Sequence, residues 1–170
     1  MAVNINKTKL KKCNVNGKKC KRINVNGVKV WVASVTVTNN GPSNRDPLVL
    51  WEDYGYNAGT VSAGSVSVKS SHSYYVSGSA QHSYWNSDTA YGSVICKSSL
   101  SIAGGSSGRI VKGKSSISFD VSYERQACLG KVICVNMMVV DVTELIEMGL
   151  SDSEIKSHMG YFTGSKTIEL

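Results

Sequence analysis

Alternation of apolar and polar residues dominates this chain, interrupted at short intervals by Gly, Ser and Asn. Residues 28–33 alternate strictly, with valines on one face and Lys, Trp and Ala on the other. A period of two is typical of β-strands. Further strand candidates lie at residues 48–51, 60–69, 73–79, 92–103, 108–112, 115–123 and 131–142. Short strands separated by frequent turns predict an all-β fold, an antiparallel, jelly-roll-like β-sandwich.

The motif Asn-Val-Asn-Gly occurs twice, at residues 14–17 and 24–27. Asn-Gly favours the type I′ turn, which needs positive φ at both central positions, so the repeat predicts two hairpins in a three-stranded meander. The expected opposite pairs are Val15 with Lys18, Asn14 with Lys19, Cys13 with Cys20, Val25 with Val28, and Ile23 with Val30. Cys20 and Ile23 then lie on opposite faces of one strand, and a β-bulge near residues 21–22 would reconcile them.

One helix is predicted near the end of the chain. Residues 151–154 have the Ser-x-x-Glu form of a capping box, Ile155 and Met159 share a face, and Gly160 follows as a stop. A shorter helical turn is expected at residues 143–148, ended by Gly149.

Charge is distributed unevenly about the loop at residues 39–44. The chain has 19 Lys and Arg against 12 Asp and Glu, a net charge of +7. Residues 1–45 hold ten of the basic residues and no acidic one, so they carry +10; the remainder has nine basic and twelve acidic residues, or −3. The predicted domains are a basic β-meander arm over residues 1–40 and a sandwich with its C-terminal helix over residues 41–170.

The arm has two interpretations. Its candidate docking residues are Lys11, Lys12, Lys18, Lys19, Lys21 and Arg22. They suit phosphate contacts, but lysines also protect exposed strands from unwanted pairing. Because no Trp, Tyr or Phe precedes Trp31, the sequence favours docking onto other subunits over nucleic-acid binding.

Composition narrows the class of protein further. With 41% hydrophobic residues the chain can form a core. The N-terminus lacks the apolar run of a signal peptide, and the longest apolar stretch, 133–140, is too short for a membrane span. The five cysteines include no Cys-x-x-Cys pair, so we expect reduced thiols, with a Cys13–Cys20 bridge as the minor alternative. No metal or cofactor is expected, although residues 52–53, Asp141 and Glu144 could supply oxygen ligands to calcium.

Enzyme classes find little support. Residues 104–108 read Gly-x-Ser-x-Gly, but the sequence favours a flexible turn there over a nucleophile elbow, and the three histidines are isolated from one another. Asp120 and Glu124 could serve a glycosidase only if they converged across a sugar. We therefore expect a non-enzyme.

Binding is the favoured class because aromatic residues gather in two expected loops, one rich in Gly and Asn and the other, around Tyr84 and Trp85, beside Asn86 and Asp88. The candidates for glycan binding are Trp51, Tyr54, Tyr56, Tyr84 and Trp85. An aromatic ring stacks on the apolar face of a sugar while amides and carboxylates bind its hydroxyls. The alternative is that Trp51 and Tyr75 are core residues and the others are ordinary surface residues.

Three segments resemble a module of tailed-bacteriophage structural proteins. Residues 135–145, Val-Asn-Met-Met-Val-Val-Asp-Val-Thr-Glu-Leu, are similar to a final strand ending in Met-x-x-Asp-Leu-Thr-Glu-Leu. Residues 161–168, Tyr-Phe-Thr-Gly-Ser-Lys-Thr-Ile, are similar to its closing Tyr-Phe-x-Gly-x-Lys-x-Ile, and residues 72–75 resemble its His-x-Tyr-Tyr strand. Residues 24–31 resemble Val-Asn-Gly-x-x-Val-Trp stretches of tail and baseplate proteins. Residues 146–151 depart from the Gly-Ala-Gly-Asn-Glu-Pro turn of the family.

The resemblance implies a bacteriophage virion structural protein, a tail, baseplate or tail-fibre component assembled in the bacterial cytoplasm. Its expected partners are other virion subunits, further copies of itself, and host-surface glycans, without membrane insertion. The alternatives are a capsid decoration or head-fibre protein, and a non-viral carbohydrate-binding module.

Overall fold

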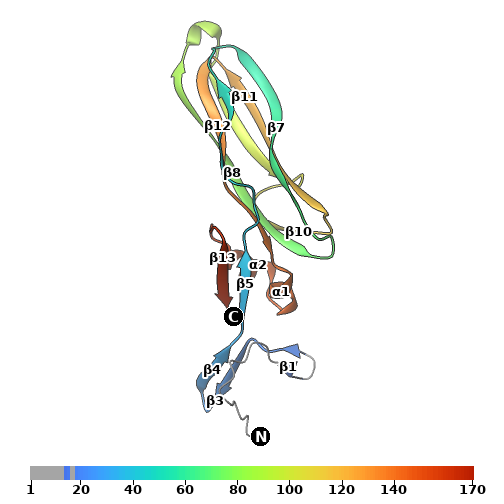
Figure 1. Ribbon diagram of the computed structural model, residues 1–170. Coiled ribbons are helices and arrows are strands. Elements are labelled where there is room, and N and C mark those ends of the chain that lie inside the picture. The colour runs from blue at the N-terminus through green and yellow to red at the C-terminus, as the bar shows by residue number, and fades with distance from the viewer. Residues whose placement is uncertain (1–13, 16–17) are drawn as a thin grey trace.

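The computed structural model describes residues 14–15 and 18–170, which form an elongated molecule (Figure 1). The strands are β1 (Asn14–Val15), β2 (Lys18–Lys19), β3 (Arg22–Val25), β4 (Val28–Val32), β5 (Ser34–Thr38), β6 (Arg45–Trp51), β7 (Tyr56–Ser67), β8 (Ser73–Ser87), β9 (Ile95–Ile102), β10 (Arg109–Lys112), β11 (Ser116–Gln126), β12 (Cys128–Asp141) and β13 (Ser165–Glu169). The helices are the 3₁₀ turn η1 (Thr89–Tyr91), α1 (Thr143–Glu147) and α2 (Asp152–His158). The strands pair antiparallel, which confirms the predicted all-β class.

Two sheets make the sandwich that fills the upper part of Figure 1. One has the strand order β10-β8-β12-β6 and the other β7-β11-β9. On β11 the odd-numbered residues 117, 119 and 121 are fully buried, while the even-numbered residues between them face away from the core. Buried side chains from both sheets meet in one cluster, including Phe119, Val132 and Val76. Two antiparallel sheets covering one apolar layer are a β-sandwich, as predicted.

All seven strands predicted for the sandwich are present, and β8 is longer than expected. The sequence suggested a strand at residues 73–79 and a loop around Tyr84 and Trp85. Instead β8 runs to Ser87 and pairs with β12 up to Cys128, so the loop prediction was wrong. Small and polar residues at 77–83 masked the strand because long-range pairing, not local apolar alternation, stabilises it.

A second core lies at the lower end of the sandwich. Residues 137–140 at the end of β12 are buried in succession. Met137 and Val139 point into the sandwich core, whereas Met138 and Val140 point into a separate cluster with Leu145, Ile155 and Ile168. A strand covered on both faces reads as a continuous apolar run rather than an alternating one.

Both helices cover this second core. Ser151 accepts from the Glu154 backbone N–H, and the Glu154 carboxylate accepts from the Ser151 N–H, which confirms the predicted capping box. Ile155 is fully buried beneath α2, and Gly149 has φ +81° after α1.

Strand β13 closes the second core by pairing with β5, from Ser165 opposite Thr38 to Glu169 opposite Ser34. The sequence analysis did not predict β13, and it placed residues 34–38 within the arm. In the structure the inward side chains Val35 and Val37 of β5 are buried in the second core. The partner strands are more than a hundred residues apart, so neither short segment shows its pairing locally.

The two predicted hairpins are present, but they form two separate two-stranded sheets, β1-β2 and β3-β4, so the predicted three-stranded meander was wrong. Asn14 lies opposite Lys19, and Val15 opposite Lys18, as expected; Cys13 lies outside the described residues, so its pairing with Cys20 stays a prediction. Val25 lies opposite Val28, but Ile23 lies opposite Trp31 rather than Val30. The register shifts between Ile23 and Asn24 because Val30 is an extra residue on β4, so the β-bulge lies on the partner strand and not near residues 21–22 as predicted.

Candidate functional site

The outward face of the β7-β11-β9 sheet is built almost entirely from small and polar residues. Strand pairing aligns its side chains in successive rows across the three strands: Ser62, Asp120 and Ser101; Thr60, Ser122 and Ser99; Ala58, Glu124 and Lys97; Tyr56, Gln126 and Ile95. These positions alternate with the buried residues of β11, so the rows face solvent. The face therefore presents hydroxyl, carboxylate, amine and amide groups at regular strand spacing.

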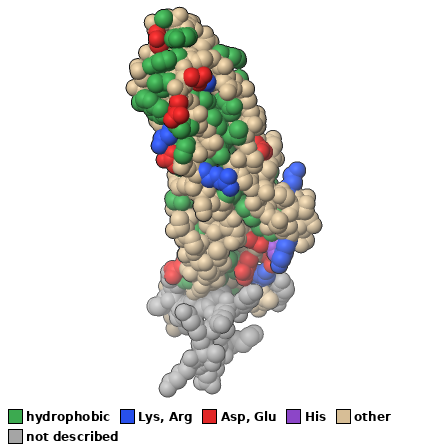
Figure 2. All heavy atoms as spheres, turned by 45° about the horizontal axis from the view of Figure 1, so that its top comes forward, with side chains coloured by type: hydrophobic (Ala, Val, Ile, Leu, Met, Phe, Trp, Pro, Cys, Tyr) green, Lys and Arg blue, Asp and Glu red, His purple; other side chains and the backbone are tan. Residues whose placement is uncertain are grey.

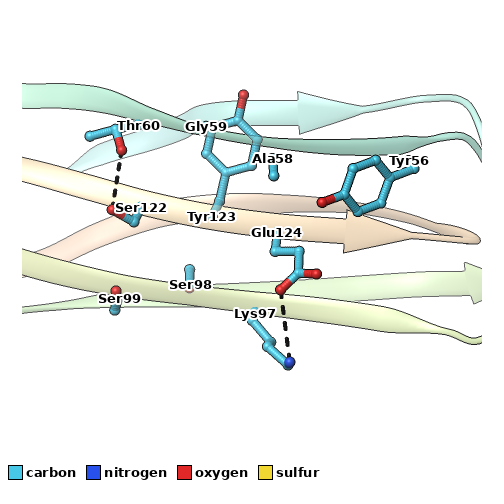
Figure 3. Close-up of a pocket in the computed structure, with 10 residues that line it drawn as sticks. All are labelled: Tyr56, Ala58, Gly59, Thr60, Lys97, Ser98, Ser99, Ser122, Tyr123 and Glu124. Atoms are coloured by element: carbon cyan, nitrogen blue, oxygen red, sulfur yellow. Dashed lines mark hydrogen bonds and ion pairs between the residues drawn. The ribbon is translucent and has the colours of Figure 1, made fainter.

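A shallow groove of about 820 Å³ lies on this face toward the Tyr56 end of β7 (Figure 3). It is lined by Tyr56, Ala58, Gly59, Thr60, Lys97, Ser98, Ser99, Ser122, Tyr123 and Glu124. The Thr60 and Ser122 hydroxyls bond to each other across β7 and β11 at 3.2 Å. A Cβ at Gly59 would lie 3.0 Å from the Tyr123 hydroxyl, so the glycine leaves room for the Tyr123 side chain.

Charge in the groove is confined to one pair. Lys97 Nζ lies 3.8 Å from Glu124 Oε2, and a dashed line joins the two groups in Figure 3. At this exposure the ion pair holds its partners weakly, so both remain able to hydrogen-bond a ligand. The Tyr56 ring lies at one end of the groove and is 63% exposed.

Beside the groove, the distal end of the sandwich carries further aromatic rings. We define this end by the β6–β7 loop, the end of β8, η1 and the start of β9, opposite the helices and β13 in Figure 1. The Tyr54 ring stacks on Tyr91 with centroids 5.8 Å apart, and Asn86 Nδ2 donates to the Tyr54 hydroxyl at 2.6 Å. Figure 2 shows hydrophobic side chains gathered on the surface toward this end.

Tyr84 and Trp85 lie on β8 immediately before Asn86, each 55% exposed. Gly130 of β12 pairs with Tyr84 and Leu129 pairs with Asn86, so Trp85 is the extra residue of a β-bulge. Bulges redirect side chains at the ends of strands. Both rings are therefore accessible, at the same end of the molecule as Tyr54.

A buried arginine fixes the loop that leads to Tyr54 and Tyr56. The Arg125 side chain is 5% exposed, and its guanidinium donates to the Asp53 backbone carbonyl and to Asp53 Oδ1, each at 2.5 Å. The same guanidinium lies 5.9 Å from the centre of the Trp51 ring. The Ala127 N–H donates to the Tyr54 carbonyl at 2.9 Å. These contacts hold the β6–β7 loop against the end of β11.

Trp51 does not belong with the accessible aromatics. It is 3% exposed and packs in the sandwich core, with its ring 5.7 Å from that of Tyr123. Trp51 is therefore a core residue, which is the alternative that the sequence left open. Of the five aromatic candidates, Tyr56 lines the groove, Tyr54, Tyr84 and Trp85 lie at the distal end, and Trp51 cannot reach a ligand without unfolding.

The candidate docking residues lie toward the opposite end, as far as they are described. Lys11 and Lys12 fall outside the described residues, and only the backbone of Lys18 is described. Lys19 Nζ pairs with Glu147 Oε2 at 2.5 Å, and Lys21 Nζ lies 3.5 Å from the Gly149 carbonyl oxygen, while Arg22 is exposed on β3. The described lysines thus contact the α1 end of their own chain.

Other chemistry is sparse in the described part of the chain. Within residues 14–15 and 18–170 no three His, Cys, Asp or Glu side chains converge as metal ligands would.

Burial and a hydrogen bond with Cys128 raise the pKa of the Cys96 thiol to about 12. Among the described helices, none has the length and apolar character of a membrane span.

Sequence reasoning missed most of the groove. Lys97, Ser99 and Ser122 come from segments with no motif, and only register brings them together. The alternation within residues 116–124, with Ser, Asp and Glu between buried apolar residues, was the one local signal that this face is polar.

Comparisons with protein-family models, with curated proteins and with solved structures found no match.

Proposed function

We propose that this chain is a structural protein of a bacteriophage particle, in its tail or baseplate, and that its sandwich binds a host-surface glycan. The observation that carries the binding half is the groove on the β7-β11-β9 face, with Tyr56 at its end and hydroxyls across its floor. The virion assignment rests on the resemblance of residues 72–75, 135–145 and 161–168 to phage structural proteins.

The chemistry of the groove suits a neutral sugar. Tyr56 offers a ring for stacking, and the hydroxyls of Thr60, Ser99 and Ser122 both donate and accept hydrogen bonds. Glu124 and Lys97 supply one strong acceptor and one strong donor at the same end as the ring. A long, shallow shape fits an extended saccharide better than a small molecule, which needs an enclosing pocket.

Binding is favoured over cleavage because Glu124 is the one carboxylate among the residues that line the groove. Most glycoside hydrolases place two carboxyl groups across the scissile bond. A particle subunit also needs an attachment end and a docking end. The groove and the distal aromatics lie toward one end of the molecule, and β1 to β4 lie at the other (Figure 1).

Binding of the purified protein to host cell-wall polysaccharides and to a glycan array tests the first half. Tyr56→Ala and Glu124→Gln are each expected to weaken binding by about tenfold or more, the loss of roughly 1.4 kcal/mol. Tyr161→Ala is the matched control, because Tyr161 is a similarly exposed aromatic far from the groove. If only Tyr84→Ala and Trp85→Ala reduced binding, the distal aromatics and not the groove would be the site.

Electron microscopy of purified particles tests the second half. Antibody labelling of the chain on a tail or baseplate is the expected result. Labelling on the head would favour the capsid decoration or head-fibre alternative. Absence from particles, with glycan binding intact, would favour a non-viral carbohydrate-binding module.

A further inference from the structure

Strand β7 is a long sheet edge that hydrogen-bonds on one side. It pairs with β11 from Tyr56 opposite Gln126 to Ser67 opposite Ser116, and no described strand pairs with its other side. In Figure 1 it borders the sandwich as its outermost labelled strand. An open edge presents unpaired N–H and C=O groups that another strand can bind.

The other edges of the sandwich carry charges or a proline that discourage such pairing, whereas β7 has only a β-bulge at Ala63, beyond residues 56–62. β6 contains Arg45, Asp46 and Pro47, and β10 has four residues and begins and ends in a cation. β9 carries Lys97 and lies against β8, where His82 Nδ1 and the Ser98 hydroxyl are 3.3 Å apart. The twelve residues of β7, Tyr-Asn-Ala-Gly-Thr-Val-Ser-Ala-Gly-Ser-Val-Ser, include no charged residue and no proline. Charges and prolines are the usual means of blocking an edge.

The accessible part of this edge is the distal half of β7. Residues 56–60 and Ser62 are exposed, and Val61 is half-buried. Further along, a Cβ at Gly64 would lie 3.4 Å from Pro42, so the 39–44 loop reaches the proximal half. Seven consecutive residues are thus open to a partner strand.

We propose that residues 56–62 of β7 pair antiparallel with the same residues of a second copy of this chain. Charge and symmetry favour a second copy of the chain as the partner. The strand is neutral, so two copies meet there without like-charge repulsion. The net charge of residues 46–170 as a whole is also small, at −3. Identical strands related by a two-fold axis match in length and satisfy each other's backbone groups.

This pairing has a consequence for the groove. A two-fold axis normal to the sheet joins β9-β11-β7 of one copy to β7-β11-β9 of the other on the same face. The two grooves then lie on one continuous six-stranded face, and a long polysaccharide can contact both. The edge buries little surface, so the dimer alone is weak, but two linked sites increase avidity without new contacts. The pairing itself does not depend on glycan binding.

Sedimentation equilibrium and amide hydrogen exchange of the full chain, over a concentration series without glycan, test the proposal. The expected result is reversible dimerisation accompanied by concentration-dependent protection at residues 56–62. Asn57→Lys with Ser62→Lys adds two charges to the edge at exposed positions that do not line the groove. This double variant is expected to raise the dissociation constant by about tenfold or more.

Ser116→Lys with Thr163→Lys is the matched control, since it adds the same charge at exposed positions away from residues 56–62. It is expected to dimerise like the wild type. A monomer throughout the series, protection confined to other segments, or an unchanged dissociation constant in the edge variant would each overturn the proposal. If the edge variant fails to fold, the exchange pattern of the wild type decides. Loss of glycan binding with dimerisation intact would reject only the proposed function.

Discussion

At the scale of single residues, Arg125 links the core to the candidate site. Of the described residues it is the one charged side chain that is buried, and its exposed partner Asp53 lies in the loop before Tyr54 and Tyr56. A buried cation is costly unless hydrogen-bonded, so the two bonds to Asp53 constrain where this loop can lie. The strand predicted at residues 115–123 stopped before Arg125, so the sequence did not indicate this buried arginine.

Asp141 joins the turn before β8 to the start of α1 through hydrogen bonds. Its carboxylate contacts His72 Nδ1 at 2.5 Å and accepts from the Thr143 N–H at 3.0 Å. Burial raises the pKa of Asp141, but the hydrogen bonds from His72 and Thr143 outweigh it and hold the pKa below its ordinary value. The ionised form is therefore favoured in the folded state.

This predicts acid sensitivity at Asp141. A carboxyl whose pKa is depressed by folding contributes stability above its unfolded pKa, about 3.9, and loses it as pH falls through the folded value. The free energy of unfolding is expected to fall below about pH 4, and Asp141→Asn is expected to lower stability at pH 7 and flatten that decline. Urea titrations between neutral pH and pH 2 measure both. An Asp141→Asn curve parallel to that of the wild type at every pH would contradict the assignment.

At the scale of elements, α2 shows which features of a helix the local sequence can predict and which it cannot. Seven residues are too few for an isolated helix to be stable, so α2 depends on its cap and its buried face. The cap was evident from residues 151–154 alone, because both of its hydrogen bonds are local. The surface that receives Ile155 comes from β5, β12 and β13 and was not evident.

Ser151→Ala is expected to lower the free energy of unfolding by about 1 kcal/mol, since the Glu154 N–H loses its acceptor. Chemical denaturation measures the change. Ser157→Ala is the matched control in the same helix; its hydroxyl bonds the Glu154 carbonyl, and alanine favours a helix, so we expect a change within about 0.5 kcal/mol. An equal decrease in the free energy of unfolding in the two variants would show that the Ser151 cap does not stabilise the helix specifically.

At the scale of the whole molecule, β12 couples the two cores. Val139 and Val140 are neighbours on one strand, yet each is fully buried in a different cluster. Unfolding either core therefore removes the support for one face of β12. This arrangement favours a single cooperative transition for the described body.

Two variants test this coupling. Phe119→Ala in the sandwich core is expected to cost about 3–5 kcal/mol and Ile155→Ala in the second core about 2–5 kcal/mol. In each variant, amides of β11 and of β13 are expected to lose exchange protection together. Loss of protection in β13 alone for Ile155→Ala would show that the second core unfolds independently.

The sequence predicted the all-β class, both Asn-Gly hairpins and the capped helix. Each of these depends on contacts between residues close in the chain: a two-residue turn, a reciprocal cap, or alternation along one strand. The seven sandwich strands were predicted for the same reason, and β8 was cut short where its apolar alternation ends.

Tertiary structure decided the β5–β13 pair, the burial of Trp51 and the composition of the groove. Ser99 and Ser122 carry no motif, and they share a row because β9 and β11 pair in one register. Trp51 and Tyr56 have similar surroundings in sequence, but one faces the core and the other ends an outward row. Backbone pairing between distant segments sets which face each side chain occupies, and a shift of one residue would reverse it. Local pattern thus determined the kinds of element, and long-range register determined which residues meet.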